Sequence, residues 1–246
     1  MKMNIKPAFR CQLSSYLRGT LVIYSILIII FAVSIFSSLY VGDNTLISLT
    51  GGGAFTTSIF MLVMGIVSIR SDLRLCLQYG VSRRTAFVGQ IMTVLAVSAI
   101  ISIGTELLMG IAQFIENGSQ RFFVADLYQI IYVGLDKTVL SFGQHIMSIL
   151  FSFFLVSSVC FVGMFFSLLF WRLSKFWTIV VAVAIPLLMN FVPLALYKAG
   201  VDLSPVIKWL GSSPVKFYFS FALASVILCV INWLLLRKAN IREAKG

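Results

Sequence analysis

Charged residues divide the chain into long apolar segments. Six stretches contain no Asp, Glu, Lys or Arg, and each holds at least 20 residues: 19–42, 44–69, 85–105, 138–171, 176–197 and 217–236. An α-helix needs roughly 20 apolar residues to cross the hydrocarbon core of a bilayer, and it satisfies its own backbone hydrogen bonds there. The pattern predicts six transmembrane helices, near residues 20–41, 53–69, 86–110, 147–170, 176–197 and 217–236.

Composition supports lipid as the surrounding medium. Of the 246 residues, 60% are hydrophobic and only 11% are charged, whereas a water-soluble domain of this length needs more polar residues to cover its surface. A transmembrane β-barrel would require alternating segments of about ten residues, which are absent. The first apolar run is too long for a signal peptide, so we expect it to be retained. We expect one all-α membrane domain over residues 1–246.

Basic residues indicate how the chain is oriented. If the N-terminus is cytoplasmic, fourteen of the 19 Lys and Arg residues lie on the cytoplasmic side. The remaining five are Arg121, Lys137, Lys198, Lys208 and Lys216. The positive-inside rule therefore predicts that both termini are cytoplasmic. The formal net charge of +11 is then a signal of orientation, and no basic soluble domain supports nucleic-acid binding.

The N-terminal segment has the pattern of an interfacial helix. Residues 6–18 carry an apolar helical face with basic side chains beside it: Phe9, Leu13, Tyr16 and Leu17, with Lys6, Arg10 and Arg18. Such a helix lies in the inner membrane interface, with its apolar side chains in the acyl boundary. The alternative is a basic tail that only sets the topology.

A short charged insert separates the second and third apolar stretches. Ser71 can cap a helix, Asp72 suits its first turn and Gly80 suits its end. These signals predict a two-turn cytoplasmic helix over residues 72–79, followed by a new helix that becomes the third span.

Arg83 and Arg84 fall in the first turn of that third helix. Positive charge there opposes the helix dipole, at a cost of about 0.3–1 kcal/mol for each exposed residue. Lipid phosphate or an acidic surface of a cytoplasmic partner would offset this cost. Simple positive-inside anchoring is the alternative.

Two outer segments are long enough to hold structure, residues 107–145 and 198–216. The first carries an apolar helical face that predicts an interfacial helix: Phe123, Leu127, Ile130 and Ile131. In the second, Ser204 as a cap, Pro205 at the first helical position and Gly211 at the end predict a short helix.

Motifs for catalysis are missing from the sequence. It contains neither GxxxxGK[ST] nor GxSxG, and one histidine makes a His-based metal site improbable. We therefore expect no catalytic residue, metal site or cofactor in this chain. The four cysteines fall in cytoplasmic or spanning segments, which predicts no disulfides: Cys11, Cys76, Cys160 and Cys229.

Glu106 is the acidic residue nearest to a span interior. It follows Arg84 by 22 residues, or about 33 Å of helix, which exceeds the roughly 30 Å hydrocarbon core. We expect its carboxylate to reach the outer interface, with a gate, a substrate contact or a proton-carrying role as alternatives. His145 is expected at the same interface. Pro186 and Pro193 predict a kink in the fifth span, which could serve as a hinge.

Taken together, these features resemble the ABC-2-type permease family. The shared features are six spans with both ends inside, a basic interfacial helix, a short helix between spans 2 and 3, and a small helical element between spans 5 and 6. The stretch LQYGVSRRTAF at 77–87 is similar to the sequence after the coupling helix of small bacterial permeases.

The resemblance implies a separate cytoplasmic ABC ATPase that would hold ATP and Mg. A groove on that ATPase would receive Asp72, Leu73, Arg74, Leu75, Cys76, Leu77, Gln78 and Tyr79, with Arg83 and Arg84 beside it. The interfacial helix, with Phe9, Arg10, Leu13 and Leu17, would rest against the same subunit.

The family further implies a multi-pass subunit of the bacterial cell membrane that pairs with a second copy or a paralogue. It would export amphipathic peptides or other hydrophobic compounds and would contact membrane lipids. Two alternatives stay open. One is a non-transporting sensor or scaffold that binds a cytoplasmic partner through the same segment. The other is a self-contained secondary transporter, although internal repeats and ionisable midplane residues are not visible.

Overall fold

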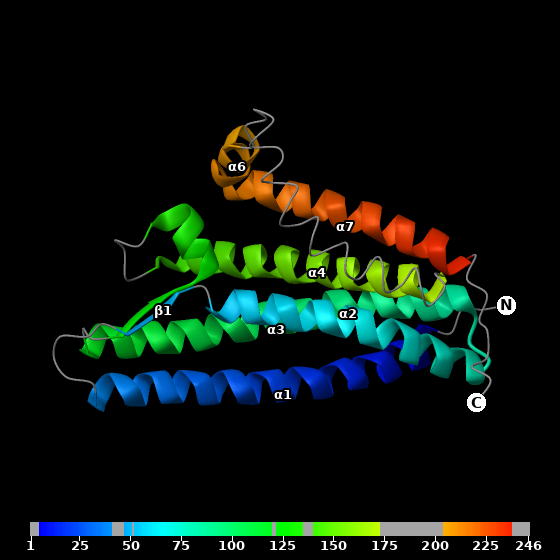
Figure 1. Ribbon diagram of the computed structural model, residues 1–246, viewed down its shortest axis with the longest axis horizontal. Helices are drawn as coiled ribbons and strands as arrows, with labels where there is room; N and C mark the ends of the chain where they lie inside the picture. The colour runs from blue at the N-terminus through cyan, green and yellow to red at the C-terminus, as the bar shows by residue number, and fades with distance from the viewer. Residues whose placement is uncertain are drawn as a thin grey trace.

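The computed structural model describes residues 5–40, 47–50, 52–119, 122–134, 140–172 and 204–237. Five long helices occupy most of them: α1 (Ile5–Tyr40), α2 (Gly52–Gln78), α3 (Arg83–Ser119), α4 (Phe142–Arg172) and α7 (Pro214–Arg237). The short elements are β1 (Ile47–Thr50), β2 (Phe122–Ala125), the π-helical turn η1 (Gln129–Val133) and α6 (Ser204–Gly211). Figure 1 shows the long helices side by side in an elongated bundle, with α1 and α7 on opposite sides.

All five long helices are long enough and apolar enough to cross a membrane. They correspond to five of the six predicted spans. The remaining prediction, 176–197 with Pro186 and Pro193, lies outside the described residues. Large apolar side chains on the outer faces of the bundle are exposed, for example Leu21 at 69%, Phe219 at 68% and Val226 at 62%. Because soluble monomers rarely expose such extended apolar faces, this surface suits contact with lipid.

The N-terminal segment is not a separate helix, contrary to the prediction for residues 6–18. Helix α1 runs without a break from Ile5 to Tyr40. Pro7 lies in its first turn, where a backbone N–H has no partner within the helix. Gly19 does not interrupt the helix either, because α2 packs on it: a Cβ atom there would lie 3.2 Å from atoms of Phe60 and Met64.

The predicted short helix over 72–79 is likewise the end of a longer one. Ser71 does not cap a new helix, because its hydroxyl donates to the carbonyl of Ser68 at 3.0 Å, inside α2. The predicted stop at Gly80 is confirmed. Its φ is +72°, its N–H donates to the Leu77 carbonyl, and the Val81 N–H donates to the Cys76 carbonyl. This is a Schellman motif, which requires a left-handed residue at that point.

Ser82 begins the next helix. Its Oγ accepts a hydrogen bond from the Thr85 N–H at 3.3 Å, and its carbonyl accepts one from the Ala86 N–H at 3.0 Å. Arg83 and Arg84 therefore occupy the first turn of α3, as the sequence pattern predicted.

The outer segment 107–145 differs from its prediction. Helix α3 continues to Ser119, and Phe123 lies in a strand rather than in an interfacial helix. Strand β2 pairs in parallel with β1, with Ile47 opposite Phe122 and Thr50 opposite Ala125. A short helical segment with η1 follows β2, and it contains Leu127 and Ile130. The predicted helix at Ser204–Gly211 is confirmed as α6.

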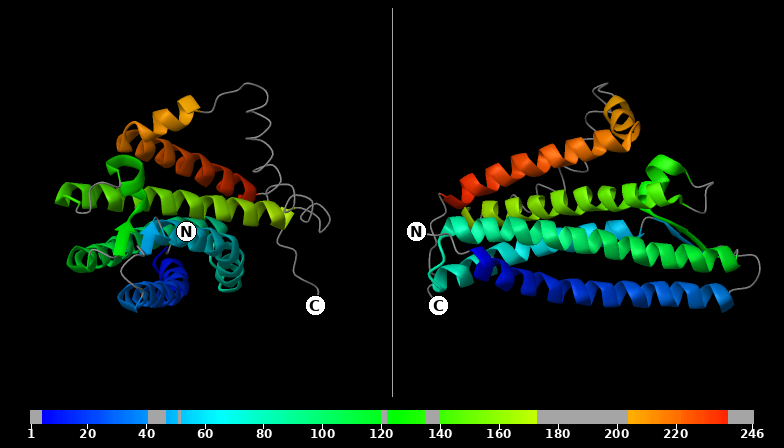
Figure 2. Two further views of the ribbon diagram at one scale, coloured as in Figure 1. Left: turned by 60° about the vertical axis from the view of Figure 1, so that its left-hand side comes forward. Right: turned by 180° about the vertical axis from the view of Figure 1, so that it is seen from behind.

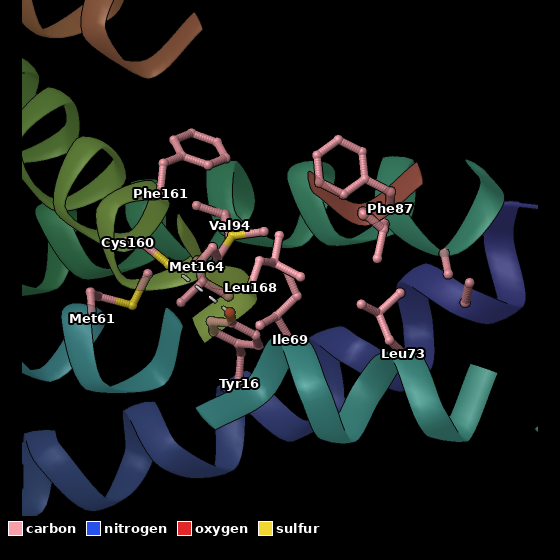
Figure 3. Packing of buried hydrophobic residues seen from close by; sticks show 14 of the residues in the cluster. Tyr16, Met61, Ile69, Leu73, Phe87, Val94, Cys160, Phe161, Met164 and Leu168 are labelled. Atoms are coloured by element: carbon pink, nitrogen blue, oxygen red, sulfur yellow. Dashed lines mark hydrogen bonds between the residues drawn. The ribbon is translucent and has the colours of Figure 1, made fainter. Parts of the chain in front are cut away.

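Helices α2 and α4 approach each other closely at two glycines. A Cβ atom on Gly65 would meet the backbone carbonyl oxygen of Cys160, and one on Gly163 would meet that of Leu62. Small residues at such crossings let two helix backbones make close van der Waals contact in a membrane. The largest buried cluster lies beside this crossing and includes Tyr16, Met61, Met164 and Leu168 (Figure 3).

Both ends of the described chain lie at one end of the bundle. The start of α1, the turn between α2 and α3, and the ends of α4 and α7 meet there, whereas β1, β2 and α6 lie at the other end (Figures 1 and 2). We call the first the basic end, because it carries Lys6, Arg10, Arg18, Arg70, Arg74, Arg83, Arg84, Arg172 and Arg237. This arrangement agrees with termini on one side of the membrane, and the choice of side stays a prediction.

Candidate functional site

The residues predicted to contact an ATPase divide into two groups at the basic end. Leu73 and Cys76 are 2% and 3% exposed and pack inside the bundle, so they are not available to a partner. Arg74, Leu75, Gln78 and Tyr79 point away from it, and Tyr79 is 79% exposed. Asp72 and Leu77 lie between the two groups, with partial exposure. Only one face of the predicted contact segment therefore forms a surface.

A buried glutamine connects the N-terminal part of α1 to this segment. Gln12 is 1% exposed, and its Nε2 donates to the Ala86 carbonyl at 3.1 Å and reaches the Cys76 sulfur at 3.8 Å. Gly89 gives it room, because a Cβ atom there would lie 2.9 Å from the Gln12 Oε1. One side chain thus joins α1, the end of α2 and the start of α3.

Tyr16 makes a second connection, four residues further along α1. Its side chain is fully buried, and its hydroxyl accepts a hydrogen bond from Gln90 Nε2 at 2.9 Å and lies 4.0 Å from the Cys160 sulfur (Figure 3). The prediction that Tyr16 faces lipid is wrong. Tyr16 is buried because it belongs to a second stripe of side chains on α1, and this stripe packs against protein: Ala8, Gln12, Tyr16 and Thr20.

The remaining residues of the predicted interfacial face lie beside that stripe. Phe9, Leu13 and Leu17 are half-buried, and Arg10 is exposed. Their apolar side chains therefore border the packed face of α1 instead of forming a free membrane-binding face.

Helix α4 is tied to the same region through α2. Arg70 Nη2 donates to the Ser167 carbonyl at 3.0 Å, and the Ser167 hydroxyl donates to the Ile66 carbonyl at 2.6 Å. Hydrogen bonds in a buried apolar environment are costly to leave unmade. These contacts connect four segments into one block that adjoins the exposed turn. The segments are the start of α1, the end of α2, the start of α3 and the end of α4.

An acidic site lies at the opposite end of the bundle. Glu106 on α3 is only 8% exposed, and its Oε1 lies 2.6 Å from Nδ1 of His145 on α4. Its Oε2 accepts a hydrogen bond from the Ser148 hydroxyl at 2.5 Å. The structure adds that α4 supplies partners that hold the carboxyl group against protein, while its expected position at the outer interface stays a prediction.

Asp126 completes this site and was not foreseen from the sequence. It follows β2, is 1% exposed, and its Oδ2 lies 2.8 Å from the same Ser148 hydroxyl. A hydroxyl group has one proton to donate. If Ser148 donates to one carboxyl group, the other can complete the contact by carrying a proton and donating to the serine oxygen. A proton held by the carboxyl pair would satisfy both contacts with Ser148 at once.

Burial raises the pKa of Asp126 above its ordinary value. The Ser148 hydroxyl and the backbone N–H groups of Leu127 and Tyr128 oppose this shift without cancelling it. The Oδ1 atom of Asp126 has no hydrogen-bond partner among the described residues. Desolvation without full hydrogen bonding favours the neutral acid, which agrees with the shared proton.

One local signal could have located Asp126. Its carbonyl accepts the Ile130 N–H at 3.0 Å, so it stands immediately before the helical segment that contains η1. Asp is a preferred residue before a helix, where it is commonly read as a cap. Nothing in the sequence showed that this position would lie against α3 and α4.

A groove of about 470 Å³ borders the acidic site on the outer surface of α3 and α4. Glu106 and His145 form its polar edge. The rest of its wall is apolar: Ile103, Leu107, Gly110, Ile111, Phe114, Phe142 and Ile149. An apolar groove with a carboxyl and an imidazole at one edge can hold an amphipathic molecule whose polar group is a hydrogen-bond donor or a cation.

The described residues contain no group of three His, Cys, Asp or Glu side chains that could hold a metal ion. Neither end of the bundle therefore offers a candidate metal centre in this part of the chain. The four cysteines are free.

Comparison with protein-family models, curated proteins and solved structures finds no match for this chain. Its function must accordingly be inferred from two features of the bundle. One is the exposed turn above a connected block at the basic end, and the other is the acidic site with its groove at the opposite end.

Proposed function

We propose that this chain is the transmembrane subunit of an ATP-driven exporter, energised by a separate cytoplasmic ATPase. In this proposal the exposed turn between α2 and α3 is the contact surface for the ATPase. The chain acts with a second copy or a paralogue in the bacterial cell membrane. It holds no nucleotide itself, since ATP and Mg would bind to the partner.

The single observation that carries the proposal is the combination of exposure and attachment at the α2–α3 turn. Arg74 and Tyr79 are exposed beyond the bundle, while Leu73 and Cys76 of the same segment are buried in its core. A partner that moved the turn would therefore displace α1, α3 and α4 as well. A flexible surface loop would dissipate such a movement, whereas a packed core transmits it.

The groove beside Glu106 supports an amphipathic cargo. Its wall is apolar, and its polar edge consists of Glu106 and His145. An amphipathic peptide or another hydrophobic compound with an amino group would place its apolar part in the groove and its amino group against Glu106. Alternating exposure of such a site to the two sides of the membrane is a recognised way to move a ligand across it.

A sensor or scaffold subunit is the second candidate, because the same turn could bind a cytoplasmic partner without transport. Co-purification distinguishes the two. An exporter subunit retains a protein with a Walker A motif that hydrolyses ATP, whereas a scaffold retains a partner without that activity.

The test is affinity purification of the tagged full chain from its native membrane. Arg74→Glu combined with Tyr79→Ala should reduce the recovered ATPase at least tenfold, because it reverses the charge and removes the exposed ring of the contact surface. The matched control is Lys208→Glu with Trp209→Ala, which alters an exposed cation and an exposed ring on α6 at the opposite end. Equal recovery of ATPase by all three proteins would refute the contact surface.

A further inference from the structure

A basic pocket lies between the start of α3 and the end of α7. It has a volume of about 360 Å³, and the described residues that line it are Arg83, Arg84, Trp233 and Arg237. None of these is acidic. Arg237 lies in the last turn of α7, and the first turn of α3 contains no acidic residue. The pocket therefore concentrates positive charge at the level where the bundle leaves the membrane.

An apolar groove of about 490 Å³ adjoins this pocket and shares Arg84 and Trp233 with it. Its other lining residues are Phe87, Val88 and Ile91 of α3 and Cys229 and Val230 of α7. The rings of Phe87 and Trp233 lie 5.4 Å apart and join the two helices. From Arg84 to Ile91 the groove follows α3 for about 10 Å, away from the basic end and into the spanning part of the bundle.

The basic pocket followed by the apolar groove matches a phospholipid, which has an anionic headgroup followed by apolar acyl chains. Arginine binds phosphate through paired, charge-assisted hydrogen bonds. Basic pockets between transmembrane helices bind anionic headgroups. Trp is enriched at the headgroup level of membranes. An acyl chain that starts at such a headgroup must run along the membrane normal, which is the direction that the groove takes beside α3.

We propose that this surface binds one anionic phospholipid, with its phosphate against Arg84 and Arg237 and an acyl chain along Phe87, Val88 and Val230. The bound anion also offsets the unfavourable placement of positive charge in the first turn of α3. The lipid thereby bridges α3 and α7 next to the α2–α3 turn. This inference does not depend on the exporter proposal, because it requires only the membrane and the two helices.

The headgroup and the groove make different contributions. Lipid tails are as apolar as the groove, so moving an acyl chain into it gains no hydrophobic free energy relative to the bilayer. Selectivity among lipids must then come from the arginines, while the groove contributes shape and packing. Removing the arginines should abolish the preference for anionic lipid, and filling the groove should reduce binding of every lipid.

Native mass spectrometry of the purified full chain tests whether the arginines select anionic lipid. The protein is mixed with equal amounts of phosphatidylglycerol and phosphatidylcholine, and retained lipids are counted. We expect the wild-type protein to retain at least tenfold more phosphatidylglycerol. Arg84→Gln with Arg237→Gln should lose that preference. The matched control, Arg10→Gln with Arg74→Gln, removes two exposed arginines at the same end outside the pocket and should keep it.

Val88→Trp with Val230→Trp tests the groove, and the circular dichroism of each variant verifies that it is folded. We expect the count of both lipids to fall several-fold without a change in their ratio. Displacement of the lipid by excess inorganic phosphate would instead assign the pocket to free phosphate. Equal retention of both lipids by the wild-type protein, or an unchanged preference after the arginine substitutions, would overturn the proposal.

Discussion

Ser148 has one proton for two carboxyl groups, and this single fact governs the acidic site. Glu106 and Asp126 come from different parts of the chain, yet both contact the same hydroxyl. Both carboxyl groups can hydrogen-bond to Ser148 while the pair keeps a proton. Above the pH at which that proton is lost, two negative charges would face one donor, and the contact between β2 and α4 would be strained.

The pH dependence of unfolding follows with a definite sign. Burial raises the pKa of Asp126 in the folded protein, so the folded chain holds this proton more tightly than the unfolded chain does. The free energy of unfolding must then fall as the pH rises from the ordinary Asp value of about 3.9 through the raised value. Asp126→Asn should remove this part of the slope, measured as thermal unfolding in detergent across that range. Parallel pH curves for the variant and the wild-type protein would contradict the prediction.

Part of this site could be predicted from the sequence. Counting helix residues from Arg84 located Glu106 near the end of its span, and His145 was expected at the same level. The structure brings these two side chains together at 2.6 Å. Asp126 could not be added, because its position depends on a strand pairing with residues that precede α2. Contacts that join distant parts of a chain leave no periodic pattern in the sequence.

At the scale of elements, α2 and α4 cross with their backbones in close contact. Gly65 and Gly163 each place a backbone against a carbonyl of the other helix. A side chain at either position has no room unless the helices separate. The crossing also holds α2 close to the point where Arg70 reaches Ser167.

Gly65→Ala should therefore destabilise the protein by about 1–3 kcal/mol, the usual cost of overpacking a filled interior. Gly110→Ala is the matched control, because it lies within α3 with no atom within 4 Å of the added Cβ. Thermal unfolding of both purified variants measures the difference. Equal unfolding temperatures would show that α2 and α4 do not cross at this glycine.

The long helices could be predicted from sequence, and so could the stop at Gly80 and the helix Ser204–Gly211, whereas the outer ends of the long helices could not. Charge-free runs identify the part of a helix that crosses lipid, but a helix continues beyond the bilayer wherever its polar residues find partners. Gln12 and Tyr16 find theirs on α3, and Ser71 finds its partner within α2. The predicted interfacial and short helices became parts of α1 and α2 for this reason. Strands of four residues carry too little pattern to be recognised.

At the scale of the whole molecule, the basic residues gather where both ends of the described chain meet. The positive-inside rule predicts that this end faces the cytoplasm. The acidic site and its groove would then lie near the outer surface, and the pocket between α3 and α7 would lie in the inner leaflet. The exporter proposal depends on this orientation, whereas the lipid proposal requires only that α3 and α7 cross the membrane.

Labelling with a membrane-impermeant maleimide tests the orientation of the chain in the membrane. Cys11 is exposed at the basic end, and Ser212 is exposed beside α6 at the opposite end. With Cys11 as the sole cysteine, we expect labelling only after the cells are permeabilised. In a chain that carries Cys11→Ser and Ser212→Cys, the new thiol should react in intact cells. The reverse pattern would invert the topology.

The parallel pairing of β1 with β2 has a mechanical consequence. Strand β1 ends just before α2, and β2 begins just after α3, while a tight turn joins the other ends of these helices. The two helices are thus connected at both ends, by the turn at one end and by the paired strands at the other. A force on the turn would separate the far ends of α2 and α3 only by breaking the pairing of β1 with β2. We expect a displacement of the turn to move both helices together and to reach Asp126, which directly follows β2.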